Sequence, residues 1–597
     1  MLAAQRSGSG RRPFPGFASA IVALALASAC KAPREAVKPP LRKPFLESSA
    51  LRDHVLVRMD SEVRAAVKAA CPSDLDFSIE GAGRVDLAFG VAAAPDPSTA
   101  RFRALLRTVD GQETVALDET RTVAAAEETR WFSREVALPR GARTLRLETR
   151  GTSRTAFWGR PAFSQRGATP ARNVIVVSLD TVRADHLGAY GYARRPTSPE
   201  LDAWARQGAL FLNAMGPAPG TLSSQMALLT GRYPSNHGVT YANWRLTGRM
   251  PVLAPDIPTL AEALGRQGLL TAAFTGAGYF ALPAGYSRGF TEFVSSDDDT
   301  LGGVATVFGK ALPWIEKHQG DPFFLFLHTY EAHEPYLDDR FARPEGLGRK
   351  DWKARNEALY DGDIRRADEY VGKLRRRLEE LSLTGRTLVV IVADHGEEFG
   401  DHFDVWSDGH GHSLYDEQVH VPFVVVGPEV PRGLRLAEAV DLTAVVPTVL
   451  SFLGAPPLAT DGRDLRRLLR GERDEGEGLA FSEDVWIGPR TWAARSTAWK
   501  LIVQGDDLAE FFLDNARRRA IRAAVDHLER EMLFHLPSDA RERDNRLVQD
   551  ASSASRLRDR LRAHVAALSR PGAEPSRGQI AVEGEVVERL RALGYMK

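Results

Sequence analysis

The fold is decided by the stretch Asn173-Val-Ile-Val-Val-Ser-Leu179, which is apolar nearly throughout and leads into Asp180. A strand with this character is typical of a parallel sheet that is covered on both faces. Similar runs occur at residues 323–327, 387–393 and 421–426. Helical stretches lie between them, at residues 259–267 and 357–381. We therefore expect an α/β domain with a doubly wound, mostly parallel sheet over residues 171–461.

Residues 49–166 show a different pattern, in which short runs alternate polar and apolar residues between turns. Such runs occupy residues 84–90, 101–107, 134–138 and 144–149. Alternation with a period of two predicts antiparallel strands. We expect a β-sandwich with a jelly-roll layout, like that of carbohydrate-binding modules. No ligand residues stand out in it, so a role as a structural spacer is favoured over sugar binding.

Residues 462–597 predict a small α+β subdomain. A strand is expected at residues 499–503, and charged helices are expected near residues 516–531 and 554–568. The whole chain has 597 residues, a length that suits about two to four domains. Its 78 basic and 78 acidic residues balance, which gives no support to a nucleic-acid partner.

The first 30 residues predict a bacterial lipoprotein signal peptide. Basic residues precede an apolar run at residues 17–29, which is too short for a membrane-spanning helix. The run ends in Leu26-Ala-Ser-Ala-Cys30, which looks like a lipobox. We expect cleavage before Cys30 and lipidation of its thiol, followed by a Pro/Lys-rich tether at residues 31–48. The protein would then be exported and held at a membrane of the cell envelope, in the periplasm or at the outer membrane. Ordinary signal-peptidase cleavage and an uncleaved anchor are the alternatives.

Whether the chain can form a disulfide depends on whether Cys30 is acylated. The chain has two cysteines, Cys30 and Cys71. If Cys30 is acylated, Cys71 is unpaired and no disulfide supports the fold. If Cys30 is not acylated, a disulfide between Cys30 and Cys71 can form in an oxidising compartment.

A further stretch, Thr221-Leu-Ser-Ser-Gln-Met-Ala-Leu-Leu-Thr-Gly-Arg232, follows the turn-rich Gly216-Pro-Ala-Pro-Gly220. A hydroxyl residue that follows such a loop and leads an apolar run predicts the first residue of a helix. Free N–H groups at a helix start attract anions. A phosphate or sulfate group would therefore lie against the hydroxyl of Thr221.

Polar residues also follow three of the predicted buried strands. Asp180 follows the first, His328 and His333 follow the second, and Asp394 and His395 follow the third. Ligands of open α/β sheets bind at the carboxyl ends of the strands. Carboxylate oxygens and imidazole nitrogens are ligands for divalent metals, and a histidine there can also protonate a leaving group.

These elements together resemble the sulfatase family of the alkaline phosphatase superfamily. The signature of that family is Cys/Ser-x-Pro-Ser-Arg-x-x-Leu-Leu-Thr-Gly-Arg. In this chain Thr221 stands at the nucleophile position, Ser223 at the proline and Gln225 at the arginine. The stretch His333-Glu-Pro-Tyr336 resembles the family's His-x-Pro-Tyr element, and the stretches at residues 533–545 and 588–595 resemble its C-terminal elements.

The resemblance implies a metal-dependent hydrolase of sulfate or phosphate esters. It makes Asp180, Thr221, Asp394 and His395 the metal ligands. Such a mixed oxygen and nitrogen set suits Zn or Mn, while Ca and Mg are alternatives that the family allows.

The resemblance also implies roles in binding and catalysis. Thr221 would be the nucleophile. His333, together with His410 or His412, would act on the transferred group, and Gln225 and His328 would contact the anionic substrate. The remaining charges after the third strand are interpreted as ordinary loop charges: Glu397, Glu398, Asp401 and His402.

Threonine at position 221 bears on the substrate. The formylglycine of sulfatases is made from cysteine or serine and not from threonine. A threonine ester has no exit through a carbonyl group, so it must be attacked directly. We therefore favour a phospho-ester, such as one in a lipid head group or a polysaccharide. The alternatives are a phosphoryl or head-group transferase of the envelope and a non-catalytic, sulfatase-like binding protein.

Overall fold

The structure is a computed structural model. It describes residues 54–568 apart from 60–61, 80–81, 93, 125–129, 166–171, 248, 297–302, 404–407, 473–477, 487 and 510–528, and it also describes residues 578–580. The predicted signal peptide, Cys30 and the tether lie outside these residues. Cys71 is a half-buried free thiol. Among the described residues, no helix combines the length and the apolar character needed to cross a bilayer.

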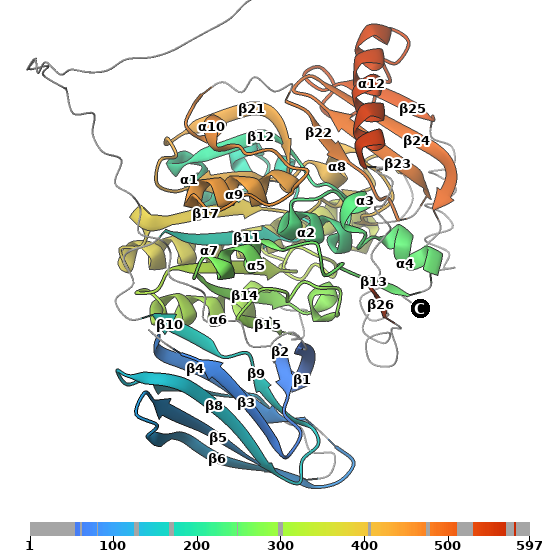
Figure 1. Cartoon of the computed structure of the whole chain (residues 1–597). Helices are drawn as coiled ribbons and strands as arrows, with labels where there is room; N and C mark the ends of the chain where they lie inside the picture. The colour runs from blue at the N-terminus through green and yellow to red at the C-terminus, as the bar shows by residue number, and fades with distance from the viewer. Residues whose placement is uncertain are drawn as a thin grey trace, which may run out of the picture. The chain divides into compact units, whose positions relative to one another are not determined.

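The largest sheet contains the predicted parallel strands (Figure 1). Its α/β strands are β11 (Asn173–Leu179), β12 (Ala209–Met215), β14 (Leu270–Gly276), β15 (Glu292–Ser296), β16 (Phe323–Thr329), β17 (Thr387–Val392), β20 (Phe423–Val426) and β21 (Leu434–Asp441). They follow the order β15-β14-β16-β11-β17-β20-β12-β21. The central strand β11 is buried along its whole length and pairs in parallel with both β16 and β17. The predicted mixed α/β fold with a mostly parallel sheet is confirmed.

Strand β20 corrects one detail of that prediction. Residues 421–426 were expected to form one of the parallel strands, but β20 runs antiparallel to both β17 and β12. A strand that is buried on both faces is apolar in either direction. An apolar run therefore does not reveal the direction of the strand.

Helices α1 to α8 fall between these strands, and α9, α10 and α12 follow β21 in the chain. They are α1 (Pro199–Gln207), α2 (Thr221–Thr230), α3 (Pro234–His237), α4 (Tyr241–Thr247), α5 (Leu260–Arg266), α6 (Val304–Lys317), α7 (Trp352–Glu380), α8 (Asp416–Val419), α9 (Val445–Leu453), α10 (Arg466–Leu469) and α12 (Ala551–Leu568). Helix α5 begins at a capping box, in which the side chains of Thr259 and Glu262 each bond the other's backbone N–H. Helix α7 begins five residues before the predicted start at 357. Helix α6 contacts β14 and β16, and α1 contacts β12 and β20.

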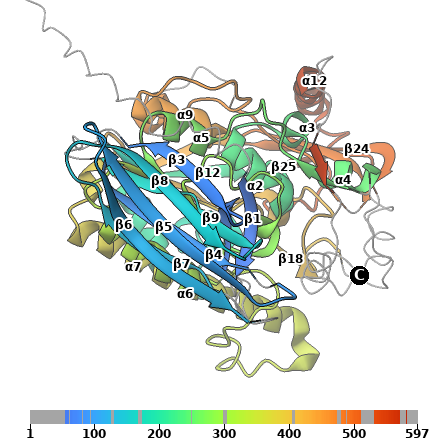
Figure 2. The same ribbon diagram turned by 60° about the horizontal axis from the view of Figure 1, so that its bottom comes forward.

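The N-terminal strands form two antiparallel layers. They are β1 (His54–Met59), β2 (Glu62–Lys68), β3 (Ser73–Ser78), β4 (Ala82–Val91), β5 (Ser98–Thr108), β6 (Glu113–Val123), β7 (Phe132–Ala137), β8 (Ala142–Gly151), β9 (Ala156–Gly159) and β10 (Ala162–Gln165). Strands β3, β8, β5 and β6 lie side by side in one sheet (Figure 2). Their core includes Phe89, Phe102 and Trp158. Strand β2 pairs antiparallel with β15, so the second layer is continuous with the α/β sheet.

The C-terminal part holds a four-stranded antiparallel sheet of β22 (Ala480–Ser482), β23 (Gly488–Arg495), β24 (Trp499–Ala509) and β25 (Glu531–His535). Helix α12 packs on β23 and β24. Four short strands form two further pairs in the described residues: β13 (Met250–Val252) with β26 (Gly578–Ile580), and β18 (Glu398–Phe399) with β19 (Asp408–Gly409). Most of the helix expected near residues 516–531 lies outside the described residues. Its expected last residue, Glu531, instead begins strand β25.

Candidate active site

Parallel pairing brings the predicted strand-end residues together. Asp180 follows β11, His328 is the penultimate residue of β16, and Asp394 comes two residues after β17. In the sheet register Ser178 is opposite both His328 and Val392. The carboxyl ends of these three strands therefore meet at one edge of the sheet, which is where α/β folds bind their ligands.

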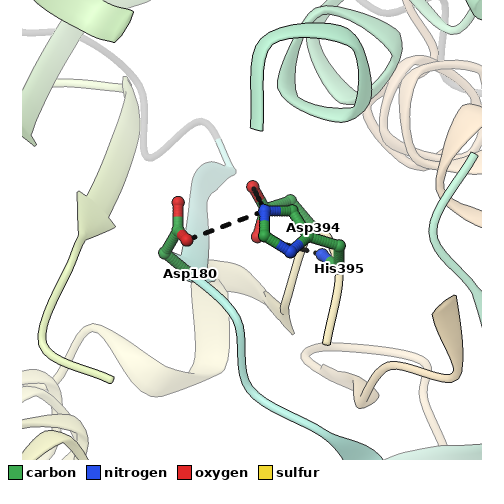
Figure 3. Close-up of side chains that lie close together, drawn as sticks. All are labelled: Asp180, Asp394 and His395. Atoms are coloured by element: carbon green, nitrogen blue, oxygen red, sulfur yellow. Dashed lines mark hydrogen bonds and ion pairs between the residues drawn. The ribbon is translucent and has the colours of Figure 1, made fainter. Parts of the chain in front are cut away.

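Asp180, Asp394 and His395 form a compact buried cluster (Figure 3). One ligand atom from each lies within 4.8 Å of the others. Nε2 of His395 is 3.8 Å from Oδ1 of Asp180 and 3.5 Å from Oδ2 of Asp394. Each of the three side chains is at most 1% exposed.

Thr221 joins this cluster as the first residue of helix α2, as its sequence context predicted. Its hydroxyl lies 3.1 Å from Nε2 of His395 and donates to Oδ2 of Asp180 at 3.3 Å. The preceding Gly220 is needed here, because a Cβ would lie 2.9 Å from the Tyr241 ring. The helix start is less open to an anion than expected, since the N–H of Leu222 donates to the Tyr241 hydroxyl.

The cluster fits a divalent cation. Within the described residues, Oδ1 of Asp180 and Oδ2 of Asp394 are buried and accept no hydrogen bond. Nδ1 of His395 is 2.9 Å from the carbonyl oxygen of Gly396, so Nδ1 carries the proton and Nε2 keeps its lone pair. Burial and the neighbouring Asp394 carboxylate raise the pKa of Asp180 well above its usual value. Two crowded carboxylates and an imidazole lone pair are a donor set that a cation would neutralise.

His328 lies directly behind Asp180. Its Nε2 is 2.9 Å from Oδ2 of Asp180, and its side chain is fully buried. Burial lowers the pKa of His328 to about 3. A neutral ring therefore donates to the Asp180 carboxylate and fixes its orientation.

The ring of His410 lies beside that of His395, and the ring of His333 lies beside that of His410. The ring of His410 is 4.2 Å from that of His395 and 5.3 Å from that of His333, centroid to centroid. Nδ1 of His333 donates to the carbonyl oxygen of Glu334 at 2.7 Å. Burial lowers the pKa of His333 to about 4. The Glu397 carboxylate contacts Nδ1 of His410 at 3.1 Å.

The acidic residues after β17 are not ordinary loop charges, which corrects that interpretation. Glu397 and Glu398 are fully buried. Glu398 accepts the backbone N–H of His402, and His402 in turn pairs with Glu417 at 2.6 Å. These charges form a buried network beside the site.

Two other predicted residues lie next to the cluster and not in it. His412 contacts Gln418 and Glu398, and the structure describes no contact between it and the three clustered side chains. Gln225 is buried and donates to the hydroxyl of Ser178 at 2.8 Å. It therefore ties helix α2 to strand β11.

Several residues at the site carry no signal in the sequence. Tyr241 holds the N–H of Leu222 and stacks on Trp486 at 4.8 Å. The backbone N–H of Trp486 donates to the carbonyl oxygen of Gly411. Asp484, at a positive φ of 65°, accepts the hydroxyl of Ser223. Asp484 and Trp486 lie in a loop, and Tyr241 begins the short helix α4. Their contacts with helix α2 and with Gly411 depend on tertiary packing, so hydrophobic periodicity does not predict them.

Comparisons with known proteins agree with this geometry. Residues 172–455 match the family model described as Sulfatase. The chain is 26% identical over 329 residues to the low-salt glycan biosynthesis sulfotransferase Agl7 of Haloferax volcanii, covering 55% of this chain and 70% of that protein. It is 27% identical over 362 residues to arylsulfatase A of Bos taurus, covering 50% and 68%. The crystal structure of a phosphonate monoester hydrolase of Agrobacterium radiobacter aligns with a TM-score of 0.51 at 21% identity, over 66% of this chain and 95% of that one.

Proposed function

Because the chain carries a sulfatase domain over residues 172–455 and so belongs to that family of ester hydrolases, we propose that Thr221 is the nucleophile of a metal-dependent reaction on an anionic ester. The observation that carries this proposal is the position of the Thr221 hydroxyl. It lies within 3.3 Å of both Asp180 and His395, at the first residue of a buried helix.

The metal would be held by Asp180, Asp394, His395 and Thr221. A bound divalent cation would lower the pKa of the Thr221 hydroxyl and offset negative charge on the transferred group. We favour Zn or Mn, because the set combines one nitrogen with several oxygens. Two further side chains support this set without joining it. His328 donates to Asp180, and Gln225 donates to Ser178, which lies on β11 two residues before Asp180.

Each step of the proposed reaction can be assigned to a side chain of the site. Oγ1 of Thr221 would bond to phosphorus or sulfur while the bond to the leaving alcohol breaks. The hydroxyl proton would pass to Oδ2 of Asp180, to which the hydroxyl already donates. The leaving oxygen needs a proton, and His410, whose ring is 4.2 Å from that of His395, or His333, 5.3 Å from His410, would supply it. Since the pKa of His333 is lowered to about 4, an anionic substrate is needed to hold a proton there near neutral pH.

A phospho-ester is the favoured substrate. The ester formed on Thr221 has no carbonyl exit, so water must attack it directly at phosphorus or sulfur. The position where sulfatases have an arginine holds Gln225, whose amide is already committed to Ser178. This position therefore supplies no charge to a sulfate group. The fold match to a phosphonate monoester hydrolase is consistent with such a substrate.

A transferase is the second candidate. It is favoured by the similarity to a protein named as a glycan biosynthesis sulfotransferase. In that reaction a hydroxyl of an acceptor, instead of water, would attack the Thr221 ester. The first steps are the same, so only the acceptor distinguishes the two candidates.

The test compares four nitrophenyl esters, namely a sulfate, a phosphate monoester, a phosphate diester and a phosphonate. Metal-loaded wild type, Thr221→Ala and Thr221→Ser are assayed on each. We expect turnover of a phospho-ester by the wild type and by Thr221→Ser, and at least a thousandfold loss in Thr221→Ala with its metal content retained. Full activity in Thr221→Ala would refute the role of Thr221 as the nucleophile. Product release that requires an added alcohol would favour the transferase.

A further inference from the structure

The side chain of Gln418 organises the loop that carries His410. Gln418 lies in the short helix α8 and is fully buried. Its Oε1 accepts three consecutive backbone N–H groups, from Gly411 at 2.9 Å and from His412 and Ser413 at 3.3 Å. Three amides that converge on one point form a concave donor site that needs an acceptor. The Gln418 oxygen fills that site, so the shape of the loop depends on it.

The nitrogen of the same amide faces two ionisable side chains. Nε2 of Gln418 is 2.8 Å from Nε2 of His412 and 3.4 Å from Oε2 of Glu398. Because the oxygen is committed to the three N–H groups, the amide has one orientation and its NH₂ group must point toward these two residues. A second pair of ionisable side chains, Glu417 and His402, lies nearby and is joined by a contact of 2.6 Å.

The backbone of Gln418 is attached to the metal cluster. Its carbonyl oxygen accepts the N–H of Gly396, the residue after His395, at 2.9 Å. The approach is close, because a Cβ on Gly396 would lie 2.1 Å from the carbonyl oxygen of Glu417. One residue thus bonds the strand end that carries His395 and the loop that carries His410.

We propose that Gln418 is a positioning residue, which sets the place of His410 beside His395 without touching the substrate. The inference rests on the proposed function, since it assumes that His410 acts on the transferred group. The His410 ring lies 4.2 Å from that of His395 and is held on its other edge by Glu397. Release of the loop would leave Glu397 as a contact but would remove the restraint on the backbone that follows His410.

The experiment compares two substitutions of similar size. Gln418→Met keeps the volume but removes the acceptor and the donor. Gln418→Glu keeps the acceptor but places a carboxylate oxygen where the NH₂ group faced Glu398. Gln319→Met is the matched control, because Gln319 is exposed and its side chain donates, among the described residues, to the Glu316 carbonyl oxygen alone. Metal content and thermal unfolding are measured for all four proteins.

The first readout is independent of activity. Amide hydrogen exchange is followed by mass spectrometry on the peptide that covers residues 409–414. We expect at least tenfold faster exchange of this peptide in Gln418→Met, near wild-type exchange in Gln418→Glu at low pH, and no change in Gln319→Met. Unchanged exchange in Gln418→Met would overturn the proposal, whatever reaction the protein catalyses.

The second readout is the pH dependence of kcat/KM relative to the wild type. In Gln418→Met we expect a loss of at least tenfold at every pH. In Gln418→Glu the loss should shrink as pH falls from 8 to 5, because a protonated carboxyl no longer repels Glu398 and can again donate one hydrogen bond, to Glu398 or to His412. A purely structural role would give both variants the same flat ratio, and a looser loop with wild-type kcat/KM would also refute the proposal. If the wild type lacks Thr221-dependent turnover, the proposed function fails, and the exchange data alone decide whether Gln418 holds the loop.

Discussion

At the scale of single residues, Asp180 and Asp394 pose an electrostatic problem that a cation solves. Both carboxylates are buried, and each has one engaged oxygen and one that accepts no hydrogen bond among the described residues. The engaged oxygen of Asp180 accepts from His328, and that of Asp394 accepts from the backbone of His395. The other two oxygens face the same imidazole nitrogen. Without a cation their mutual repulsion opposes folding.

This arrangement predicts opposite effects of Asp180→Asn on two properties. The amide oxygen still accepts from His328, but one of the crowded charges is removed. We expect the metal-free variant to be more stable than the metal-free wild type by about 1–3 kcal/mol, and its metal affinity to fall at least about tenfold. Scanning calorimetry with and without metal checks both. The control is Asp185→Asn, which removes a carboxylate that is 59% exposed and paired with Arg183.

If Asp180→Asn lowered the stability of the metal-free protein, the two carboxylates would not be in conflict. The cluster would then be an ordinary buried hydrogen-bond network. If Asp185→Asn changed the stability by the same sign and amount, the effect of Asp180→Asn would be due to net charge and not to the cluster.

The same scale shows which site residues a sequence can reveal. Asp180, Asp394 and His395 follow buried strands, and Thr221 begins a helix, so each stands at a boundary that periodicity marks. Gln418 stands in a four-residue helix with no such mark. Its role comes from three amides in a neighbouring loop, a contact that depends on tertiary packing alone.

At the scale of elements, a half-buried histidine holds helix α12 against its neighbours. The His564 ring stacks on Phe481 with centroids 3.9 Å apart and packs against Tyr233 at 4.5 Å. Burial lowers the pKa of His564 to about 4. Between pH 6.5 and 4 the unfolded chain therefore binds a proton at this residue that the folded chain does not.

The resulting prediction is a pH-dependent loss of stability that is specific to His564. Its contribution is complete above pH 6.5 and is lost as pH falls toward 4, by about 2 kcal/mol after allowance for its partial exposure. His564→Phe keeps the stacked ring but cannot take a proton. The free energy of unfolding of the variant minus that of the wild type should rise as pH falls through this range. A difference that does not change with pH would show that His564 titrates normally.

The strands and helices also show two features that the sequence does not predict, namely strand direction and the start of a helix. Burial on both faces predicted β11, β16, β17 and β20, but not that β20 runs antiparallel. Direction is set by the connections between strands, and periodicity carries no information about them. The start of α7 was placed five residues late, because its first turns have no buried stripe to continue.

At the scale of the whole molecule, the N-terminal strands complete an edge of the α/β sheet. Strand β2 pairs antiparallel with β15 through Arg64 and Val294, and β15 is the last parallel strand at that end of the α/β sheet. The N-terminal layers have their own core around Phe89 and Trp158. Sequence reasoning predicted both sheets as separate units and missed the pairing that joins them, because long-range register leaves no local signal.

This pairing predicts what removal of the N-terminal strands would do. A chain that begins at residue 172 would expose the backbone N–H and C=O groups of β15, a strand whose interior residues are buried in the whole protein. Unprotected edge strands pair with other chains. We expect the shortened protein to form dimers and larger species in size-exclusion chromatography with light scattering, while the full described chain elutes as a smaller species at the same concentration. A shortened chain that stays monomeric at the same concentration would contradict this prediction, because the N-terminal layers would then not be needed to protect the edge.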